Sequence, residues 1–140
     1  MKLRTYVQTT LVLATAGLLF SGYLTAVKIF SRRCAFNEPC PYFLGYPACW
    51  YGFGLFLVMF LTAAIALGLD TKRLWPVGVN GVVSFVGILF AGSFVWPEIQ
   101  TWLASGGTAT YQLGLPTCVY GLIFYIIIFI LSLTAIRQKK

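Results

Sequence analysis

The chain has 140 residues, of which 59% are hydrophobic and 9% charged, a composition that indicates one membrane domain (residues 1–140) and not a soluble protein. It has no histidine and only three acidic residues, which excludes histidine-activated nucleophiles, paired-carboxylate catalysis and His/Asp metal sites. The net charge of +7 comes from basic residues near segment ends. This position favours contact with the headgroups of a lipid bilayer, and we expect no nucleic-acid partner.

Four apolar segments are long enough to cross a bilayer as helices, which takes roughly 20 residues each. They cover about residues 6–30, 47–69, 74–96 and 115–136. The basic residues on one side of these segments are Lys2, Arg4, Lys72, Arg73, Arg137, Lys139 and Lys140, against Lys28, Arg32 and Arg33 on the other. The positive-inside rule therefore predicts an integral membrane protein with both termini in the cytoplasm. The loops at about 31–46 and 97–114 then face a periplasm, the cell exterior or a lumen.

All four cysteines are predicted on or near this outer face. Cys34 and Cys40 lie in the first outer loop, whereas Cys49 and Cys118 lie just inside the helices that follow the two outer loops. Disulfides persist in such compartments. Thiol chemistry is therefore the most distinctive chemistry that this composition leaves open.

The chain contains an internal duplication. L-G-Y-P-A-C-W-Y-G at 44–52 and L-G-L-P-T-C-V-Y-G at 113–121 agree at six of nine positions, 69 residues apart, and G-L-L-F-S-G-Y-L at 17–24 resembles G-I-L-F-A-G-S-F at 87–94. We expect two helix–loop–helix repeats, at about 6–69 and 74–136. The first segment, which has a counterpart inside the chain, is then a retained helix and not a cleaved signal peptide.

Each predicted repeat contains two spans, so both repeats have the same orientation and are related by a pseudo-twofold axis along the membrane normal. The expected fold is an all-α membrane protein, a four-transmembrane-helix bundle. Small residues would let the helix backbones approach closely, and they are Gly17, Gly22, Gly87 and Gly92. Asn80 and Ser84 are polar residues in the third span, and we expect them to hydrogen-bond between helices, with contact to a ligand as the alternative.

The repeat suggests how the cysteines are paired. Pro47 and Pro116 suit the first turn of a helix, and Cys49 and Cys118 follow two residues later, where the positive end of the helix dipole favours thiolate over thiol. Equivalent residues near a twofold axis face each other. Cys49 and Cys118 are therefore candidates for a disulfide or a thiol pair.

Cys34 and Cys40 enclose five residues in the first outer loop, and the second outer loop has no cysteine. This pair fits two interpretations equally: an exposed pair that exchanges with the thiols of a partner, and a structural disulfide that fixes the loop. Binding of a soft metal is a third interpretation, because thiolates suit Cu(I) and zinc.

The order of these motifs resembles that of the vitamin K epoxide reductase family, particularly its bacterial members. The end of the family's first helix looks like S-G-Y-L-T-A-V-K at 21–28, and its loop cysteine pair looks like C-A-F-N-E-P-C at 34–40. The start of its second helix looks like L-G-Y-P-A-C-W-Y-G-F at 44–53. The active-site C-x-x-C of its fourth helix falls where this chain has C-V-Y-G, at 118–121. The resemblance implies a membrane thiol–disulfide oxidoreductase. In this family the C-x-x-C reduces a quinone, and the loop pair relays electrons from a thioredoxin-like extracytoplasmic partner.

The chain departs from the family at one position, because Gly121 stands where the second active-site cysteine is expected. Either the protein is an inactive relative with a structural role, or Cys49 replaces the missing thiol. The duplication favours the replacement. Electrons would then pass from the partner through Cys34/Cys40 and Cys49/Cys118 to a quinone of the ubiquinone or menaquinone type.

Five aromatic residues are candidates for an apolar quinone pocket. Tyr125 lies seven residues after Cys118, where animal members of the family have a quinone-contacting tyrosine. The other candidates are Trp50, Tyr51, Tyr120 and Phe124. The alternative is that these rings pack between helices or form an interfacial belt against lipid. Two further functions remain open: a non-enzymatic scaffold or partner-binding protein with disulfide staples, and a soft-metal transporter.

Overall fold

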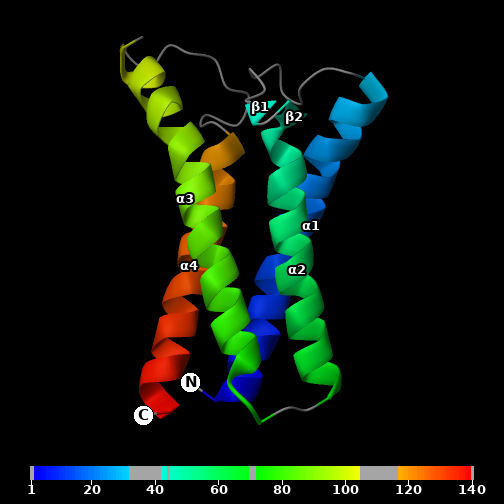
Figure 1. The fold of residues 1–140 in the computed structure, drawn as a ribbon, viewed down its shortest axis with the longest axis vertical. Helices are drawn as coiled ribbons and strands as arrows, with labels where there is room; N and C mark the ends of the chain where they lie inside the picture. Colours follow the sequence, from blue (N-terminus) through cyan, green and yellow to red (C-terminus); the bar gives the residue numbers. More distant parts are fainter. Residues whose placement is uncertain (1, 32–41, 44, 70–71, 105–116, 140) are drawn as a thin grey trace.

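The computed structural model describes residues 2–31, 42–43, 45–69, 72–104 and 117–139, and in this part of the chain long helices run side by side (Figure 1). They are α1 (Leu3–Ser31), α2 (Ala48–Gly68), α3 (Trp75–Ala104) and α4 (Thr117–Lys139). Each contains a stretch long and apolar enough to cross a membrane: Leu3–Val27, Trp50–Gly68, Trp75–Pro97 and Val119–Gln138. The chain is an integral membrane protein, and the predicted four-helix bundle is confirmed.

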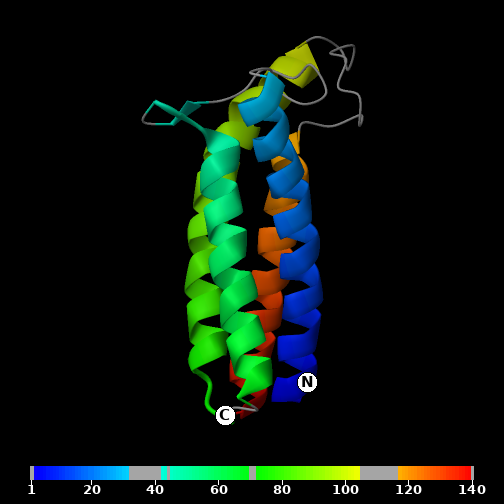
Figure 2. The same ribbon diagram turned by 90° about the vertical axis from the view of Figure 1, so that its right-hand side faces the viewer.

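The two ends of the bundle differ in what they carry. The N-terminus, the C-terminus and the α2–α3 connection lie together at one end, which we call the terminal end (Figures 1 and 2). Exposed basic side chains flank the helices there: Lys2, Arg4, Lys72, Arg73 and Arg137. Helices α2 and α4 both begin at the opposite end, which we call the cysteine end because Cys49 and Cys118 belong to their first turns.

Helix α3 extends further than the sequence predicts. The third span was expected to end near residue 96, but α3 continues through Pro97 to Ala104. Proline removes one backbone hydrogen bond and disfavours helix on its N-terminal side, yet the helix here continues beyond it. At 1.5 Å per residue, α3 is about 45 Å long, more than the roughly 30 Å of a hydrocarbon core. The outer ends of α1 and α3 splay apart at the cysteine end (Figure 1).

A short hairpin precedes α2, within the segment predicted to be a loop. Strands β1 (Tyr42–Phe43) and β2 (Tyr46–Pro47) are antiparallel, with Tyr42 opposite Pro47 and Phe43 opposite Tyr46. Gly45 in the turn has a φ of 85°, a conformation that costs glycine little and other residues much. Pro47 therefore ends a strand and does not lie in the first helical turn, which corrects the prediction by one residue. Its predicted counterpart, Pro116, lies outside the described residues.

The buried residues follow the internal repeat. Every buried position of α1 between Tyr6 and Ser21 has a buried counterpart in α3 that is 70 residues further along the chain. Helices α2 and α4 show a similar relation at a distance of 69 residues, with one exception: Thr62 is buried, whereas its counterpart Leu131 is half-buried. The buried pairs of α2 and α4 are Phe56 and Tyr125, Met59 and Ile128, Ala63 and Ser132, and Ala66 and Ala135. Equivalent helices thus present equivalent faces to the core, as a pseudo-twofold axis along the bundle requires.

Equivalent contacts also occur in the two repeats. Gly17 of α1 lies against the Phe56 ring of α2, and Gly87 of α3 lies against the Tyr125 ring of α4. The Phe56 and Tyr125 rings stack on each other, with centroids 4.6 Å apart and planes 10° apart. Since these two rings are equivalent by the repeat, the pseudo-twofold axis passes between them.

The four glycines that were expected to let helices approach closely do not all do so. Gly17 and Gly87 each admit an aromatic ring from a neighbouring helix, and Gly22 faces the Phe53 ring, 3.4 Å from the position a Cβ would take. At Gly92, no atom of another helix among the described residues lies within 4 Å of that position. Within the described part of the chain, Gly92 therefore does not serve the expected close approach of two helices.

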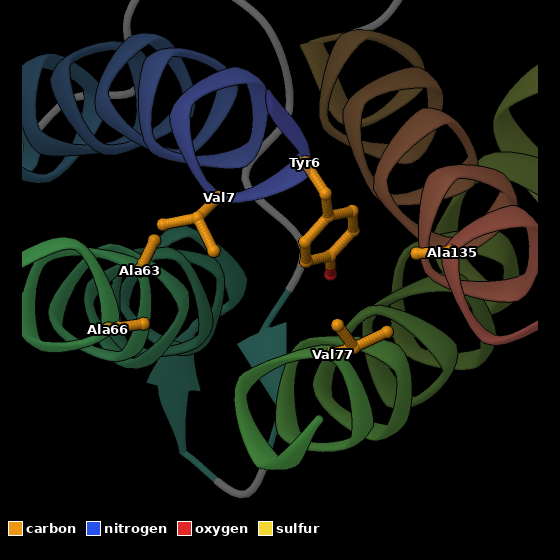
Figure 3. Close-up of a cluster of buried hydrophobic side chains, with 6 residues drawn as sticks. All are labelled: Tyr6, Val7, Ala63, Ala66, Val77 and Ala135. Atoms are coloured by element: carbon orange, nitrogen blue, oxygen red, sulfur yellow. The ribbon is translucent and has the colours of Figure 1, made fainter. Parts of the chain in front are cut away.

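The core contains two apolar clusters stacked along the bundle. The first lies nearer the terminal end and combines side chains of all four helices (Figure 3): Tyr6, Val7, Ala63, Ala66, Val77 and Ala135. The second lies nearer the cysteine end and contains Ala14, Phe56, Met59, Ala91, Tyr125 and Ile128. The stacked Phe56 and Tyr125 rings belong to this second cluster.

Polar side chains are buried together with these clusters. The predicted interhelical hydrogen bonds of Asn80 and Ser84 are not found: Ser84 Oγ donates to the Gly81 carbonyl of its own helix at 3.0 Å, and the Asn80 amide atoms have no hydrogen-bond partner among the described residues. A serine hydroxyl can reach a carbonyl one turn back, which satisfies it within its helix. The bond that does join two helices connects the Tyr6 hydroxyl to Ser132 Oγ at 2.7 Å.

Candidate redox site

The backbone places two of the predicted catalytic cysteines at equivalent positions. Cys49 is the second residue of α2 and Cys118 is the second residue of α4. Both helices begin at the cysteine end of the bundle (Figure 1), so both residues belong to the first turn, as the sequence predicts. Their side chains lie outside the described part of the structure, as do Cys34 and Cys40 entirely. Their pairing stays a prediction.

Two of the predicted aromatic residues directly follow Cys49 in the first turn of α2. Trp50 is 39% exposed, and Tyr51 is half-buried. The Tyr51 ring meets the Phe90 ring of α3 at a centroid distance of 5.5 Å. Tyr51 therefore contributes to the seam between α2 and α3.

Tyr120 has the equivalent environment in the second repeat. Its ring meets the edge of the Phe20 ring of α1 at 6.1 Å, with an interplanar angle of 64°. Tyr51 corresponds to Tyr120, and Phe90 to Phe20, so the two pairs are related by the pseudo-twofold axis. They stand on different seams, one between α2 and α3 and the other between α1 and α4.

The remaining two predicted aromatic residues converge on one ring at the centre of the bundle. Phe124 meets the edge of the Phe56 ring at 6.3 Å, whereas Tyr125 stacks on it. Tyr125 is 2% exposed, and its hydroxyl donates to the Gly52 carbonyl of α2 at 3.3 Å. The structure thus brings Phe124 and Tyr125 together on Phe56 and leaves Tyr51 and Tyr120 on separate seams.

Three aromatic residues that sequence reasoning did not select complete this arrangement. Phe20, Phe56 and Phe90 are the ring partners of four of the five predicted residues, namely Tyr51, Tyr120, Phe124 and Tyr125. The signal was present in the repeat itself, because Phe20 and Phe90 are 70 residues apart, and Phe56 is the counterpart of Tyr125. Listing pairs of aromatic residues at the repeat distance would have found them.

Gly121 stands where the second active-site cysteine is expected. Among the described residues, a Cβ atom at this position would meet no atom of a neighbouring element within 4 Å. Residues three apart on a helix share a face, so Gly121 and Cys118 are on the same side of α4. The equivalent glycine of the first repeat, Gly52, faces the Tyr125 hydroxyl at 3.8 Å from its would-be Cβ.

Among the described residues, no group of three or more His, Cys, Asp or Glu side chains is arranged to hold a metal ion. The soft-metal interpretation involves cysteine side chains outside this part of the chain, so it stays a prediction. Comparisons with protein-family models, with curated proteins and with solved structures find no match to the chain.

Proposed function

We propose that the protein is a membrane thiol–disulfide oxidoreductase that passes electrons from the thiols of an extracytoplasmic partner to a membrane quinone. Cys34 and Cys40 receive the electrons, and Cys49 and Cys118 deliver them. Trp50, Tyr51, Tyr120, Phe124 and Tyr125 are the proposed residues for the apolar surroundings of the quinone, which is of the ubiquinone or menaquinone type.

One observation supports this proposal above the others. Cys49 and Cys118 hold the same position in two helices that begin at the same end of a pseudo-twofold bundle. Residues related by such an axis can meet at it, as the equivalent rings of Phe56 and Tyr125 do. A thiol pair formed between the repeats would replace the pair that the C-x-x-C of similar enzymes forms within one helix.

The proposed reaction balances as two successive exchanges and one oxidation. A partner dithiol reduces the Cys34–Cys40 disulfide, and the resulting dithiol reduces the Cys49–Cys118 disulfide. The Cys49 and Cys118 thiols then give two electrons and two protons to the quinone, which leaves as quinol while their disulfide re-forms. The cofactor-like quinone carries the redox chemistry, and the protein positions the thiols.

The proposed orientation places both termini in the cytoplasm and the cysteine end outside. The support is the row of exposed basic side chains at the terminal end, which suits the cytoplasmic face of a membrane. Modification of intact cells with a membrane-impermeant thiol reagent, after reduction, tests it. Labelling of Cys34 and Cys40 is expected, and labelling only after the membrane is opened would place the cysteine end inside.

The function is tested by measuring quinone reduction by the purified protein with a reduced dithiol donor. The native chain is expected to be active, and Cys49→Ala and Cys118→Ala are each expected to abolish turnover. Val119→Ala is the matched control, since it changes the residue beside Cys118 and removes neither a thiol nor a residue of the proposed quinone surroundings.

Full activity of Cys49→Ala would show that Cys49 does not replace the missing thiol. Inactivity of the native chain with several quinones and donors would favour the alternative, a disulfide-stapled scaffold or partner-binding protein. Alkylation with and without prior reduction, followed by mass measurement, separates the two, because a scaffold keeps its disulfides while an active enzyme cycles between thiol and disulfide.

A further inference from the structure

A layer of polar side chains lies inside the bundle, in the half nearer the terminal end. Tyr6 and Thr10 come from α1, Asn80 from α3 and Ser132 from α4. None of the four side chains is more than 1% exposed. Because they belong to a bundle that spans a membrane, water and lipid headgroups outside the protein do not reach them.

Two members of this layer satisfy each other. Ser132 Oγ donates to the Ile128 carbonyl at 2.9 Å, so in its 2.7 Å bond with the Tyr6 hydroxyl the tyrosine is the donor. Figure 3 shows the Tyr6 ring reaching from α1 into the space between α3 and α4. This bond joins the first helix of the chain to the last.

The other two members are less well satisfied. The side chains of Thr10 and Asn80 lie close enough to the Tyr6 hydroxyl to act on it as weak hydrogen-bonding groups. Within the described part of the chain, however, neither the Thr10 hydroxyl nor either amide atom of Asn80 makes a hydrogen bond of normal distance and angle. Four other threonines of the bundle each donate to a carbonyl one turn back in their own helix: Thr15, Thr25, Thr134 and Thr62, which donates to Val58 at 2.8 Å. A buried polar group without a partner costs about 1–3 kcal/mol, so three such atoms in one place point to a ligand.

We infer that this layer binds an ordered water molecule that bridges Asn80, Thr10 and the Tyr6 hydroxyl. Buried waters typically make about three hydrogen bonds to polar groups that the protein leaves unsatisfied. The amide of Asn80 offers a donor and an acceptor, and the hydroxyl of Thr10 offers both. Two small residues adjoin the layer: Ala63 packs in the same cluster as Tyr6, and Gly81 lies beside Ser132, whose Cβ is 3.4 Å from the position of a would-be Cβ at Gly81.

The chemistry of the layer favours water over a monovalent cation. Its oxygen atoms are neutral hydroxyl and amide oxygens, and none of the described residues that form the layer is an acid. A cation buried in a bilayer without a compensating charge is costly. Water satisfies both the donor and the acceptor of the Asn80 amide, whereas a cation satisfies the acceptor alone.

The bridging water has a structural consequence. Thr10 and Asn80 are counterparts, 70 residues apart in the repeat. A water bound between them, together with the bond between Tyr6 and Ser132, would link the two repeats at the terminal end. The stacked rings of Phe56 and Tyr125 link them in the other half of the core.

The test is a crystal structure of the full chain, from crystals grown in a lipid phase, at a resolution that shows ordered waters. A density peak is expected within about 2.7–3.2 Å of Asn80 and Thr10. In Thr10→Val the peak is expected to be lost or displaced. In Thr62→Val, which removes a buried hydroxyl that already has a partner, it is expected to remain.

Two results would overturn the inference. The first is direct hydrogen bonding of the Asn80 amide to Thr10 or Tyr6 with no peak between them. The second is a peak that gives anomalous scattering after the monovalent cation of the crystals is exchanged for rubidium, which would identify an ion. The native chain alone decides between these results, so the test does not depend on the folding of either variant. It is also independent of the proposed redox function.

Discussion

Two glycines determine how closely neighbouring helices of each repeat pack. An added methyl group on Gly87 would lie 2.6 Å from the Tyr125 ring, and one on Gly17 would collide with the Phe56 ring. Real Cβ atoms do not come this close to ring carbons. The aromatic stack at the pseudo-twofold axis therefore depends on the absence of a side chain at these two positions.

We expect Gly87→Ala to lower the free energy of unfolding by about 1–3 kcal/mol, the usual cost of overpacking a core. The ring of Tyr125 is held by Phe56 and cannot move aside freely. Unfolding of the purified protein in mixed micelles, followed by circular dichroism, measures the change. Gly92→Ala is the control, because its new methyl group would meet no neighbouring helix within the part of the chain that the structure describes. Equal effects of the two variants would contradict the packing argument.

Gly121 has the opposite property, since none of the described residues of neighbouring elements lies within 4 Å of a Cβ added there. We expect Gly121→Cys to fold as the native chain does and to create a C-x-x-C with Cys118. If Cys49 normally pairs with Cys118, the new cysteine competes for that thiol. Peptide mapping after alkylation of the free thiols would then show a disulfide between Cys118 and residue 121. Exclusive pairing of Cys118 with Cys49 in this variant would show that the pair between the repeats is strongly preferred.

At the scale of helices, two tyrosine hydroxyls join elements that are distant in the sequence. Tyr6 connects α1 to α4 at 2.7 Å, whereas Tyr125 connects α4 to α2 at the longer distance of 3.3 Å. Hydrogen bonds between membrane helices average about 0.6 kcal/mol and reach about 1.7 kcal/mol. The shorter bond, between fully buried groups, should lie near the upper value and the longer one near or below the average.

We therefore expect Tyr6→Phe to lower the free energy of unfolding by more than 1 kcal/mol, and Tyr125→Phe by about 0.5 kcal/mol or less. Both substitutions keep the ring and remove one hydroxyl, so each serves as the control for the other. Unfolding of both variants under the same conditions measures the difference. A larger loss for Tyr125→Phe would show that its hydroxyl has a stronger partner than the Gly52 carbonyl.

The elements differ in how well the sequence predicts them. Four helices follow from hydrophobic length alone, and α2 and α4 begin within two residues of the expected positions. The extension of α3 beyond Pro97 was missed because proline is normally read as a helix boundary. The hairpin before α2 was missed because strands of two residues carry no periodic signal.

The candidate site was predictable only in part, for reasons that concern single residues. The first-turn positions of Cys49 and Cys118 follow from the repeat. The burial of Tyr125 does not, because a tyrosine in an apolar helix can face lipid, a pocket or the core equally well. Its place was decided by Gly87, a residue of another helix, and contacts between helices are not encoded in the local pattern. The same holds for Asn80, because whether its amide finds a hydrogen-bond partner depends on the side chains of the other three helices.

At the scale of the whole molecule, the bundle is a pair of similar helical hairpins. Helix α1 packs chiefly on α2, and α3 chiefly on α4, with smaller contacts of α2 with α3 and of α1 with α4. The aromatic pairs Phe20–Tyr120 and Tyr51–Phe90 lie on the two smaller contacts. Association of the hairpins thus depends on a few specific side chains, because lipid solvates apolar helix surfaces as well as another helix does.

This arrangement predicts that the chain can be divided between Asp70 and Thr71 without loss of the fold. Each half keeps a complete hairpin, since the cut lies in the connection at the terminal end and crosses no helix. Co-expressed halves are expected to copurify from membranes through a tag on one of them. In helical membrane proteins, helices that are inserted independently associate by packing, so the covalent link between α2 and α3 is not required.

Phe56→Ala in the first half should weaken this copurification, because it removes the ring that stacks on Tyr125 across the pseudo-twofold axis. Phe85→Ala in the second half is the control, since Phe85 is 48% exposed and its ring meets Phe129 of the same hairpin at 5.8 Å. If the halves fail to associate although each is inserted, the connection at residues 70–71 holds the bundle together, and the repeats are not independent folding units. If Phe56→Ala and Phe85→Ala behave alike, the stacked pair at the axis is not what joins them.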